Sequence, residues 1–379
     1  MRFKLFVAVI LAVTLATNPA HGITVIPEDR IPAVFKELTK NKSLANPAMV
    51  LIDLKSGQVI FSKDGGGARK PASTLKLLSA MSILEFLPPD TTFTTSIYKT
   101  DLKNTVQIVG DFDPSITPSY SLAREDGFIW SNYLVNKIRS SVRSHRLTIR
   151  YYGITSRTQI NMANYFRQLG YRVSWRPLTE SAANSHITSE ISKSVSPDLA
   201  KILNHTLLWS DNQVAEYVAR LAAKKAGYTY NAAGIDSVFK DVLTRYQIQN
   251  PVINAADGSG LSSKDRISAL TLAEALVRIY NDPKFNSIVL GLPVGGVSGT
   301  LEKRFIRTAP QGVGLVRAKT GSLRGVVSLA GYVDSGDHEY AFVIIADRVR
   351  KYRAAEDAAR ATIDRILGKL TAPLNPKTD

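Results

Sequence analysis

The 379-residue chain contains no cysteine, which excludes disulfides, thiol catalysis and thiolate metal ligands. Its stability must therefore come from apolar burial, and 44% hydrophobic residues supply enough material for two packed domains. The five histidines are scattered, and no His-Glu-x-x-His run or phosphate-binding glycine motif occurs. We therefore expect neither a metal nor a cofactor.

Acidic residues are also in deficit, because 48 Lys and Arg against 32 Asp and Glu give a formal net charge of +16. A positive field of this kind favours anionic partners. Arg2 and Lys4, the apolar run 5–16 and the small residues around His21 are typical of a secretory signal, so we expect residues 1–22 to be removed on export to the periplasm. That run is shorter than the roughly 20 residues a membrane-spanning helix needs.

Because the protein is expected to be exported, anionic wall polymers or a membrane surface are more available partners than nucleic acid. We do not expect nucleic acid as a partner. Peripheral association with the membrane or the wall is left open, as is the oligomeric state.

Local periodicity predicts an α+β fold, with an antiparallel sheet flanked by helices and an all-helical subregion. A helix opening at Ser73 is predicted to end at Pro88-Pro89. The other predicted elements are a helix over 30–41, a hairpin of 49–54 and 58–62, helices over 197–226, up to 246 and over 268–280, strands over 313–320, 326–333 and 340–347, and a closing helix over 351–367.

Residues 91–190 differ in composition and are predicted to form a smaller inserted domain, which divides the main domain into 23–90 and 191–370 and leaves a tail at 371–379. Within the predicted insert, residues 127–179 contain nine Lys or Arg and no Asp or Glu, interleaved with aromatic residues. This pattern is typical of a polyanion-binding or sugar-binding surface. It equally fits an aromatic core beneath a solvated basic face.

Three polar motifs occur in a fixed order along the main domain: Ser73-Thr74-Leu75-Lys76, Ser210-Asp211-Asn212 and Lys319-Thr320-Gly321. S-x-x-K, S-D-N and K-T-G in this order are the shared signature of penicillin-binding proteins and serine β-lactamases. A serine hydroxyl needs a base to become nucleophilic, and a lysine three residues later lies on the same helix face.

We therefore assign Ser73 as nucleophile and Lys76 as its base. The pKa of Lys76 must be lowered by burial and by a second positive charge, for which Lys319 is the candidate. Ser210 is predicted to relay a proton to the leaving amine. Asn212 is predicted to contact the substrate amide or to hold Lys76.

The K-T-G motif is predicted to end a strand and to bind substrate, together with Ser322 and Asp211. Lys319 and Thr320 suit a terminal carboxylate, and Gly321 permits close approach of an extended peptide. The backbone N–H groups of Ser73 and Ser322 are the natural pair of oxyanion donors.

A second S-x-x-K, at 237–240, and a K-S-G, at 55–57, fall outside the required order. They are interpreted as helix surface and hairpin turn.

The residues around the motifs resemble class C penicillin-binding proteins, the envelope D-alanyl-D-alanine carboxypeptidase/endopeptidases. The similar segments are 73–76, 210–216, 257–262, 292–301 and 319–323. The resemblance implies a penicillin-binding, serine β-lactamase-like transpeptidase fold interrupted by an insert, peptidoglycan stem peptides as substrate and β-lactams as covalent inhibitors. The insert departs from the family pattern because Ser73 and Ser210 are only 137 positions apart.

Two alternatives remain. A serine β-lactamase needs a base to activate the deacylating water, and no Glu-x-x-Leu-Asn run follows Asn212. Glu216 and Glu274 are interpreted as helix-surface carboxylates. The other alternative is a non-catalytic envelope protein that binds anionic wall polymer through its basic insert.

Overall fold

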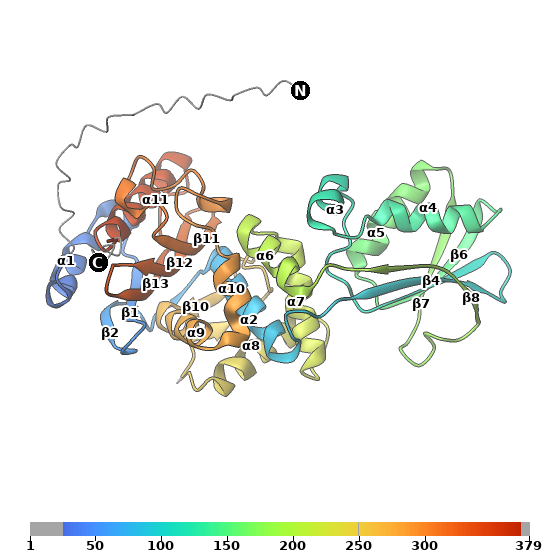
Figure 1. Cartoon of the computed structure of the whole chain (residues 1–379), viewed down its shortest axis with the longest axis horizontal. Helices are drawn as coiled ribbons and strands as arrows, with labels where there is room; N and C mark the ends of the chain where they lie inside the picture. The colour runs from blue at the N-terminus through green and yellow to red at the C-terminus, as the bar shows by residue number, and fades with distance from the viewer. Residues whose placement is uncertain (1–25, 249, 373–379) are drawn as a thin grey trace, which may run out of the picture.

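The computed structural model describes residues 26–248 and 250–372. The predicted signal at 1–22 and the tail from residue 373 lie outside these ranges. In the described part of the chain, no helix combines the length and apolarity that a membrane crossing requires. The molecule is elongated, with residues 94–195 forming one end (Figure 1).

The main sheet has five antiparallel strands in the order β11-β12-β13-β1-β2. They are β1 (Ala48–Asp53), β2 (Val59–Lys63), β11 (Val316–Leu323), β12 (Val326–Asp334) and β13 (Glu339–Ala346). The predicted hairpin and meander are thus confirmed. α1 (Ile31–Leu38) and α11 (Arg353–Gly368) pack on one face, and α9 (Ala269–Asn281) packs on the other. Because both of their faces are buried, β1, β12 and β13 are nearly continuous apolar runs.

A helical region adjoins this sheet and shares its larger core. It consists of α2 (Lys76–Phe86), α6 (Leu199–Trp209), α7 (Asn212–Lys225), α8 (Ala232–Arg245), α9 and α10 (Asn286–Gly291). The prediction of unbroken helix over 197–226 is wrong, because the chain turns at Ser210, whose φ is 63°. A small sheet of β3 (Ala68–Arg69), β10 (Arg266–Ser268) and β9 (Ile253–Asn254) lies beside the helices.

Residues 94–195, called the insert below, form a second five-stranded sheet in the order β7-β6-β5-β4-β8. Its strands are β4 (Thr94–Thr100), β5 (Thr105–Gly110), β6 (Arg146–Tyr152), β7 (Arg172–Pro177) and β8 (Ile187–Val195), of which β5, β6 and β7 pair in parallel. α4 (Ser131–Ser141) and α5 (Ser156–Gln168) cover one face, and α3 (Tyr120–Asp126) lies nearer the helical region (Figure 1). The sheet and helices enclose a separate apolar core. We propose that this unit is the predicted inserted domain, although β8 continues five residues past the expected boundary at 190.

Along β6 and β7, four arginines lie on the sheet face opposite the aromatic side chains of the core. Tyr151, Phe166 and Trp175 pack into the core under α4 and α5. Arg146, Arg150, Arg172 and Arg176 alternate with core residues along β6 and β7, so they lie on the other face. In these two strands the interleaved sequence pattern is therefore core residues alternating with a basic outer face.

Candidate active site

Ser73 lies in a short 3-10 turn, Ala72–Leu75, that leads directly into α2. The prediction that Ser73 opens an α-helix is therefore corrected: the α-helix begins at Lys76, one turn after Ser73. Ala72 has a φ of 50°, in the left-handed region that costs a non-glycine residue energy. Gly260 packs against this residue, since a Cβ at Gly260 would lie 1.9 Å from the Ala72 carbonyl oxygen. The surrounding packing thus holds the candidate nucleophile on a strained turn.

An ion-pair network fixes the chain just before this turn. The Arg69 side chain is buried and its Nη1 donates to Asp347 Oδ1 at 2.8 Å, while Nη2 contacts Asp64. The backbone N–H of Lys70 donates to Asp347 Oδ2 at 3.2 Å. These contacts join β3 to the end of β13 and leave the turn that carries Ser73 little freedom.

Lys76 is 1% exposed, and its ammonium donates to three oxygens. Its Nζ lies 2.8 Å from Ser73 Oγ, 2.7 Å from Asn212 Oδ1 and 2.6 Å from the Ser259 carbonyl oxygen. Three acceptors satisfy the three hydrogens of an ammonium group. The structure therefore brings Ser73, Lys76 and Asn212 together, and of the two sequence alternatives for Asn212 it favours holding Lys76.

Burial lowers the pKa of Lys76 to about 8, although Asp257, Asp211 and Asp265 act in the opposite direction. Lys319 does not supply the positive charge that was expected to lower the pKa of Lys76. Burial, followed by the charge of Lys76, holds the pKa of Lys319 well below its usual range. Desolvation is therefore the main cause of the lowered Lys76 pKa.

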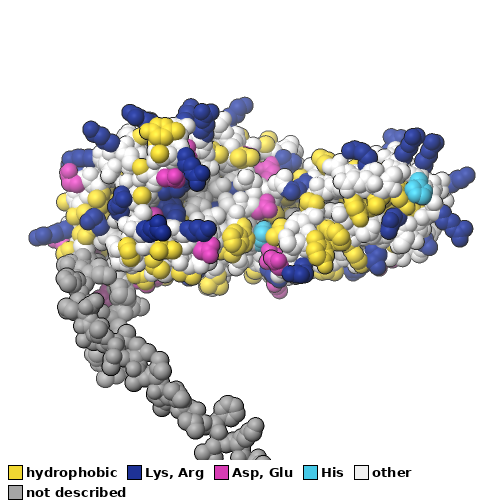
Figure 2. All heavy atoms as spheres, turned by 90° about the horizontal axis from the view of Figure 1, so that it is seen from above, with side chains coloured by type: hydrophobic (Ala, Val, Ile, Leu, Met, Phe, Trp, Pro, Cys, Tyr) yellow, Lys and Arg dark blue, Asp and Glu magenta, His cyan; other side chains and the backbone are white. Residues whose placement is uncertain are grey.

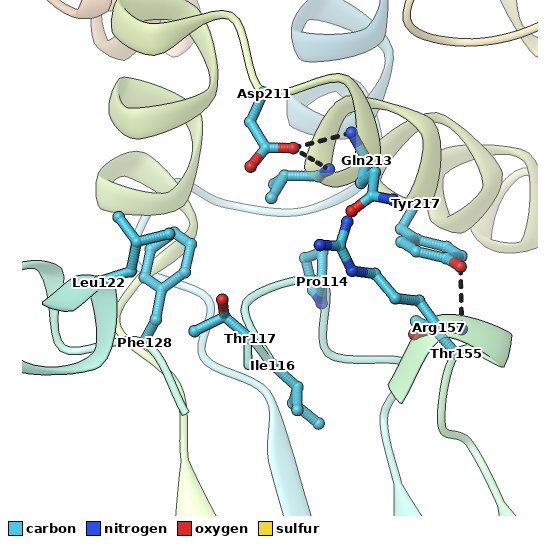
Figure 3. Close-up of a pocket in the computed structure, with 11 residues that line it drawn as sticks. Pro114, Ile116, Thr117, Leu122, Phe128, Thr155, Arg157, Asp211, Gln213 and Tyr217 are labelled. Carbon is cyan, nitrogen blue, oxygen red and sulfur yellow. Dashed lines mark hydrogen bonds between the residues drawn. The ribbon is translucent and has the colours of Figure 1, made fainter. Parts of the chain in front are cut away.

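The S-D-N motif forms the break between α6 and α7. Ser210 is half-buried at the end of α6. Asp211 caps α7, because its Oδ1 accepts from the N–H groups of Gln213 at 2.8 Å and Val214 at 3.0 Å (Figure 3). The expectation that Asp211 binds substrate gains no support from this contact, which instead fixes the direction in which Asn212 leaves the turn.

The K-T-G motif lies inside β11 and not at its end, which corrects the sequence prediction. Lys319 is fully buried, and its Nζ donates to the Thr320 carbonyl oxygen at 3.1 Å. Thr320 Oγ1 lies 2.8 Å from Thr300 Oγ1, on a loop outside the sheet. Ser322 is exposed, and its Oγ accepts from Arg360 on α11 at 3.2 Å.

β11 is the edge strand of the main sheet, so one side of its backbone is available. Ala318 N donates to Pro293 O at 2.9 Å across this outer edge. Backbone directions alternate along a strand, so Thr320 and Ser322 direct their N–H and C=O groups to the same edge. Among the described residues, an isolated β-bridge pairs Val294 with Arg317 at this edge, and no strand pairs with the edge beyond it. The edge is open to an extended peptide next to Ser322.

Gly321 has a packing role that the sequence did not reveal. A Cβ there would lie 2.1 Å from Ser328 Oγ and 2.8 Å from the Pro71 carbonyl oxygen. The same two groups are hydrogen-bonded at 2.6 Å. Gly321 thus lets β11 lie directly against the segment before Ser73.

The loop 257–262 is the main part of the site that sequence reasoning left without a role. The Asp257 carboxylate accepts from the N–H groups of Ser259, Gly260 and Ser262 at 2.6 to 2.7 Å, which folds the loop around it. Glu216 Oε2 accepts from Gly258 N at 2.7 Å, so this glutamate braces the loop and is not a simple surface carboxylate. Glu216 lies in the segment 210–216 that resembles class C penicillin-binding proteins, and this resemblance was the sign in the sequence that the residue has a role.

The two decoy motifs have the structural roles expected for them. Ser237 and Lys240 lie on α8, where the serine hydroxyl bonds to Ala233 O and the lysine pairs with Asp236. Lys55-Ser56-Gly57 forms the turn between β1 and β2. Within the described residues, no group of three or more His, Asp or Glu side chains could hold a metal ion.

Comparison with known families identifies the family of the chain. The D-Ala-D-Ala carboxypeptidase 3 (S13) family matches residues 33–141 and 141–370, most of the chain. The protein belongs to this family. The S13 match runs through the insert as well as the motif-bearing region, and the penicillin-binding α+β fold predicted from the motifs is confirmed.

Individual relatives of this S13 protein are matched over part of their length. A penicillin-sensitive carboxypeptidase A of Dictyostelium discoideum is 36% identical over 168 residues, 40% of this chain and 31% of the relative. Carboxypeptidase DacB of Mycolicibacterium smegmatis is 33% identical over 174 residues, 44% of this chain and 38% of the relative. The chain thus spans about a third of the length of the curated relatives it matches.

Solved structures share the fold across almost the whole S13 chain. Penicillin binding protein 4 of Haemophilus influenzae has a TM-score of 0.69 at 18% identity, covering 87% of this chain and 97% of that one. A predatory endopeptidase of Bdellovibrio bacteriovorus has a TM-score of 0.59 at 15% identity, covering 87% and 94%.

Proposed function

We propose that this S13-family protein is a serine D-alanyl-D-alanine carboxypeptidase/endopeptidase that acts on peptidoglycan stem peptides through an acyl-enzyme on Ser73. The observation that carries the proposal is the position of Lys76 Nζ between Ser73 Oγ and Asn212 Oδ1, at 2.8 and 2.7 Å. With a pKa of about 8, a tenth of Lys76 is neutral near pH 7 and able to accept a proton.

In the first half-reaction, Ser73 Oγ attacks the carbonyl carbon of the penultimate D-alanine while its proton passes to Lys76 Nζ. The open edge of β11 binds the peptide backbone, and the N–H groups of Ser73 and Ser322 stabilise the oxyanion. The peptide C–N bond then breaks, and the leaving amine takes a proton through Ser210. Water hydrolyses the acyl ester and regenerates the Ser73 hydroxyl.

A β-lactam is the simplest probe of this proposal, because it acylates the same serine. Mature protein incubated with a fluorescent penicillin is expected to become labelled, whereas Ser73→Ala remains unlabelled. A matched control is Ser237→Ala, which removes the serine of the second S-x-x-K motif. An unlabelled wild-type protein would leave the non-catalytic alternative, and rapid turnover of a cephalosporin would indicate a β-lactamase.

Products from defined muropeptides separate the two peptidase activities. Loss of one terminal alanine by mass indicates a carboxypeptidase, and division of a cross-linked dimer indicates an endopeptidase. Both outcomes agree with the Ser73 acyl-enzyme. Intact substrate after labelling by penicillin would contradict peptidoglycan peptides as the substrate.

The proposed substrate requires export, for which the signal-like residues 1–22 are the support. Periplasmic localisation is tested by fractionation of cells that express the full chain, compared with a chain that begins at residue 23. We expect the full chain in the periplasm and the shortened chain in the cytoplasm.

The basic face of the insert supports a second contact, with an anionic polymer of the cell envelope. Arg146 and Arg150 on β6 stand directly opposite Arg172 and Arg176 on β7. None of the four forms an ion pair with an acid among the described residues. Like charges placed opposite each other repel, and a bound polyanion relieves that repulsion.

A further inference from the structure

A pocket adjoins the candidate active site at the S-D-N turn. It has a volume of about 390 Å³ and lies between α6 and α10, with Asp126 of the insert at its rim. Trp209, the residue before Ser210, forms part of its wall. The volume falls in the range of small-molecule sites, about 300 to 1,000 Å³. No step of the proposed reaction uses this pocket.

The apolar part of the pocket is unusually exposed. Trp209 is 56% exposed and Leu290, on α10, is 70% exposed, and both line the pocket. Gly291 fixes this wall, because a Cβ there would lie only 3.1 Å from the Cα of Asn204 and the two helices pack backbone to backbone. Figure 2 shows hydrophobic side chains beside a histidine at the waist of the molecule. Exposed apolar surface that lines a pocket is typical of a binding site.

Polar groups complete the pocket and have unused hydrogen-bonding capacity. The Ser287 hydroxyl is buried and has no partner among the described residues. His205 Nδ1 lies 2.9 Å from Asp126 Oδ2, which holds this carboxylate at the rim. The side chains of Lys201 and Asn204 make no hydrogen bond within residues 26–248 and 250–372. A buried hydroxyl without a partner costs stability unless a ligand or water satisfies it.

These features select the chemistry of the ligand. One carboxylate, Asp126, and one ammonium, Lys201, flank the pocket, so it lacks the single-sign field of the arginine face. A neutral ligand with an apolar face and several hydroxyl groups matches an aromatic platform surrounded by donors and acceptors. A pyranose ring has both properties, with C–H groups on its face and hydroxyls at its rim.

We propose that the Trp209 pocket binds a neutral amino-sugar ring of the glycan strand from which the stem peptide extends. This inference rests on the proposed function, since it assumes a peptidoglycan substrate. Simultaneous contact with the sugar and the peptide raises the effective concentration of the scissile bond near Ser73. Disaccharide-linked peptides are therefore cleaved more efficiently than free peptides.

Calorimetric titration of the mature protein with tri-N-acetylchitotriose tests the sugar site directly. We expect binding by the wild type, at least about tenfold weaker binding by Trp209→Ala, and substantial retention by Trp209→Tyr. Leu290→Ser weakens binding without altering the residue next to Ser210. Tyr352→Ala, which removes an equally exposed aromatic far from the pocket, binds as the wild type does.

A kinetic comparison supplies the second readout. The ratio of kcat/KM for a disaccharide-linked peptide to that for the sugar-free peptide is expected to fall about tenfold in Trp209→Ala. Absence of oligosaccharide binding by the wild type, or an unchanged ratio in both pocket variants, would overturn the sugar site. Failure of penicillin labelling in the wild type would instead overturn the proposed function, so the two failures are distinguishable.

Discussion

The two five-stranded sheets of this protein differ in how many of their faces are covered. Helices bury both faces of the main sheet, and its edge strand β11 carries Lys319 into the core. The insert sheet is covered on one face by α4 and α5, and its other face carries four arginines. The doubly covered sheet fixes the K-T-G segment of β11 beside the turn that carries Ser73, while the singly covered sheet leaves a basic surface exposed.

The largest expected effect concerns Lys76, beside the main sheet. Lys76→Met removes the proposed base, so the rate of acylation by penicillin should fall about 100- to 10,000-fold. Lys240→Met removes the lysine of the second S-x-x-K motif on the surface of α8 and should acylate at the wild-type rate. Stopped-flow acylation of the two variants measures this. Equal rates in both variants would mean that Lys76 is not the base.

Loss of one arginine should affect stability strongly beside the main sheet and hardly at all in the insert. Arg69→Met leaves Asp347 and Asp64 without their partner at the base of the Ser73 turn, which should cost about 3 to 5 kcal/mol. Arg176→Met removes an exposed arginine from the insert and should change stability by no more than about 0.5 kcal/mol. Urea denaturation measures both. A small loss for Arg69→Met would show that the network does not hold the turn.

The region around the main sheet could be predicted well from sequence because β1, β12 and β13 are nearly continuous apolar runs and the motifs stand in a known order. What escaped prediction depends on tertiary contacts. The φ of Ser210 breaks a helix that periodicity alone would continue, and β11 extends through Gly321 because β12 pairs with it. The Ser259 carbonyl contacts Lys76 across 183 positions, so local sequence contains no sign of it.

The insert was harder to predict because its composition supports two structures. Trp175 and Arg176 are adjacent in sequence, but the pleat places one in the core and the other on the basic face. Only assignment of β7 as a strand separates them. Its parallel pairing with β6 is a long-range contact that sequence periodicity does not encode.

The pH dependence of acylation should follow Lys76. With a pKa of about 8, the neutral fraction and the acylation rate should rise about tenfold from pH 7 to a plateau above pH 9. The lowered pKa means that the unfolded chain binds more protons between about pH 8 and the usual lysine pKa. The free energy of unfolding should therefore rise with pH in that window, and the burial cost should be fully present below it.

Lys76→Met provides the control for this linkage. Its free energy of unfolding should rise less with pH above pH 8 than that of the wild type, because methionine does not titrate and Lys319, whose pKa is also lowered, keeps its own contribution in both proteins. Denaturation at several pH values compares it with the wild type. A rate profile that is flat from pH 7 to 9 would contradict the lowered pKa.

The smallest expected effect concerns the arginine face of the insert sheet. Arg172→Glu converts a repulsive cross-strand pair with Arg146 into an attractive one, which should stabilise the protein by about 0.2 to 1 kcal/mol. The same change should weaken binding to an immobilised polyanion, because it removes two units of positive charge from the face. Arg143→Glu makes the same charge change in the loop between α4 and β6, where no strand places an arginine opposite it. If both variants gain equal stability, the effect comes from net charge, whereas a gain confined to Arg172→Glu means that the arginine face is maintained against its own repulsion.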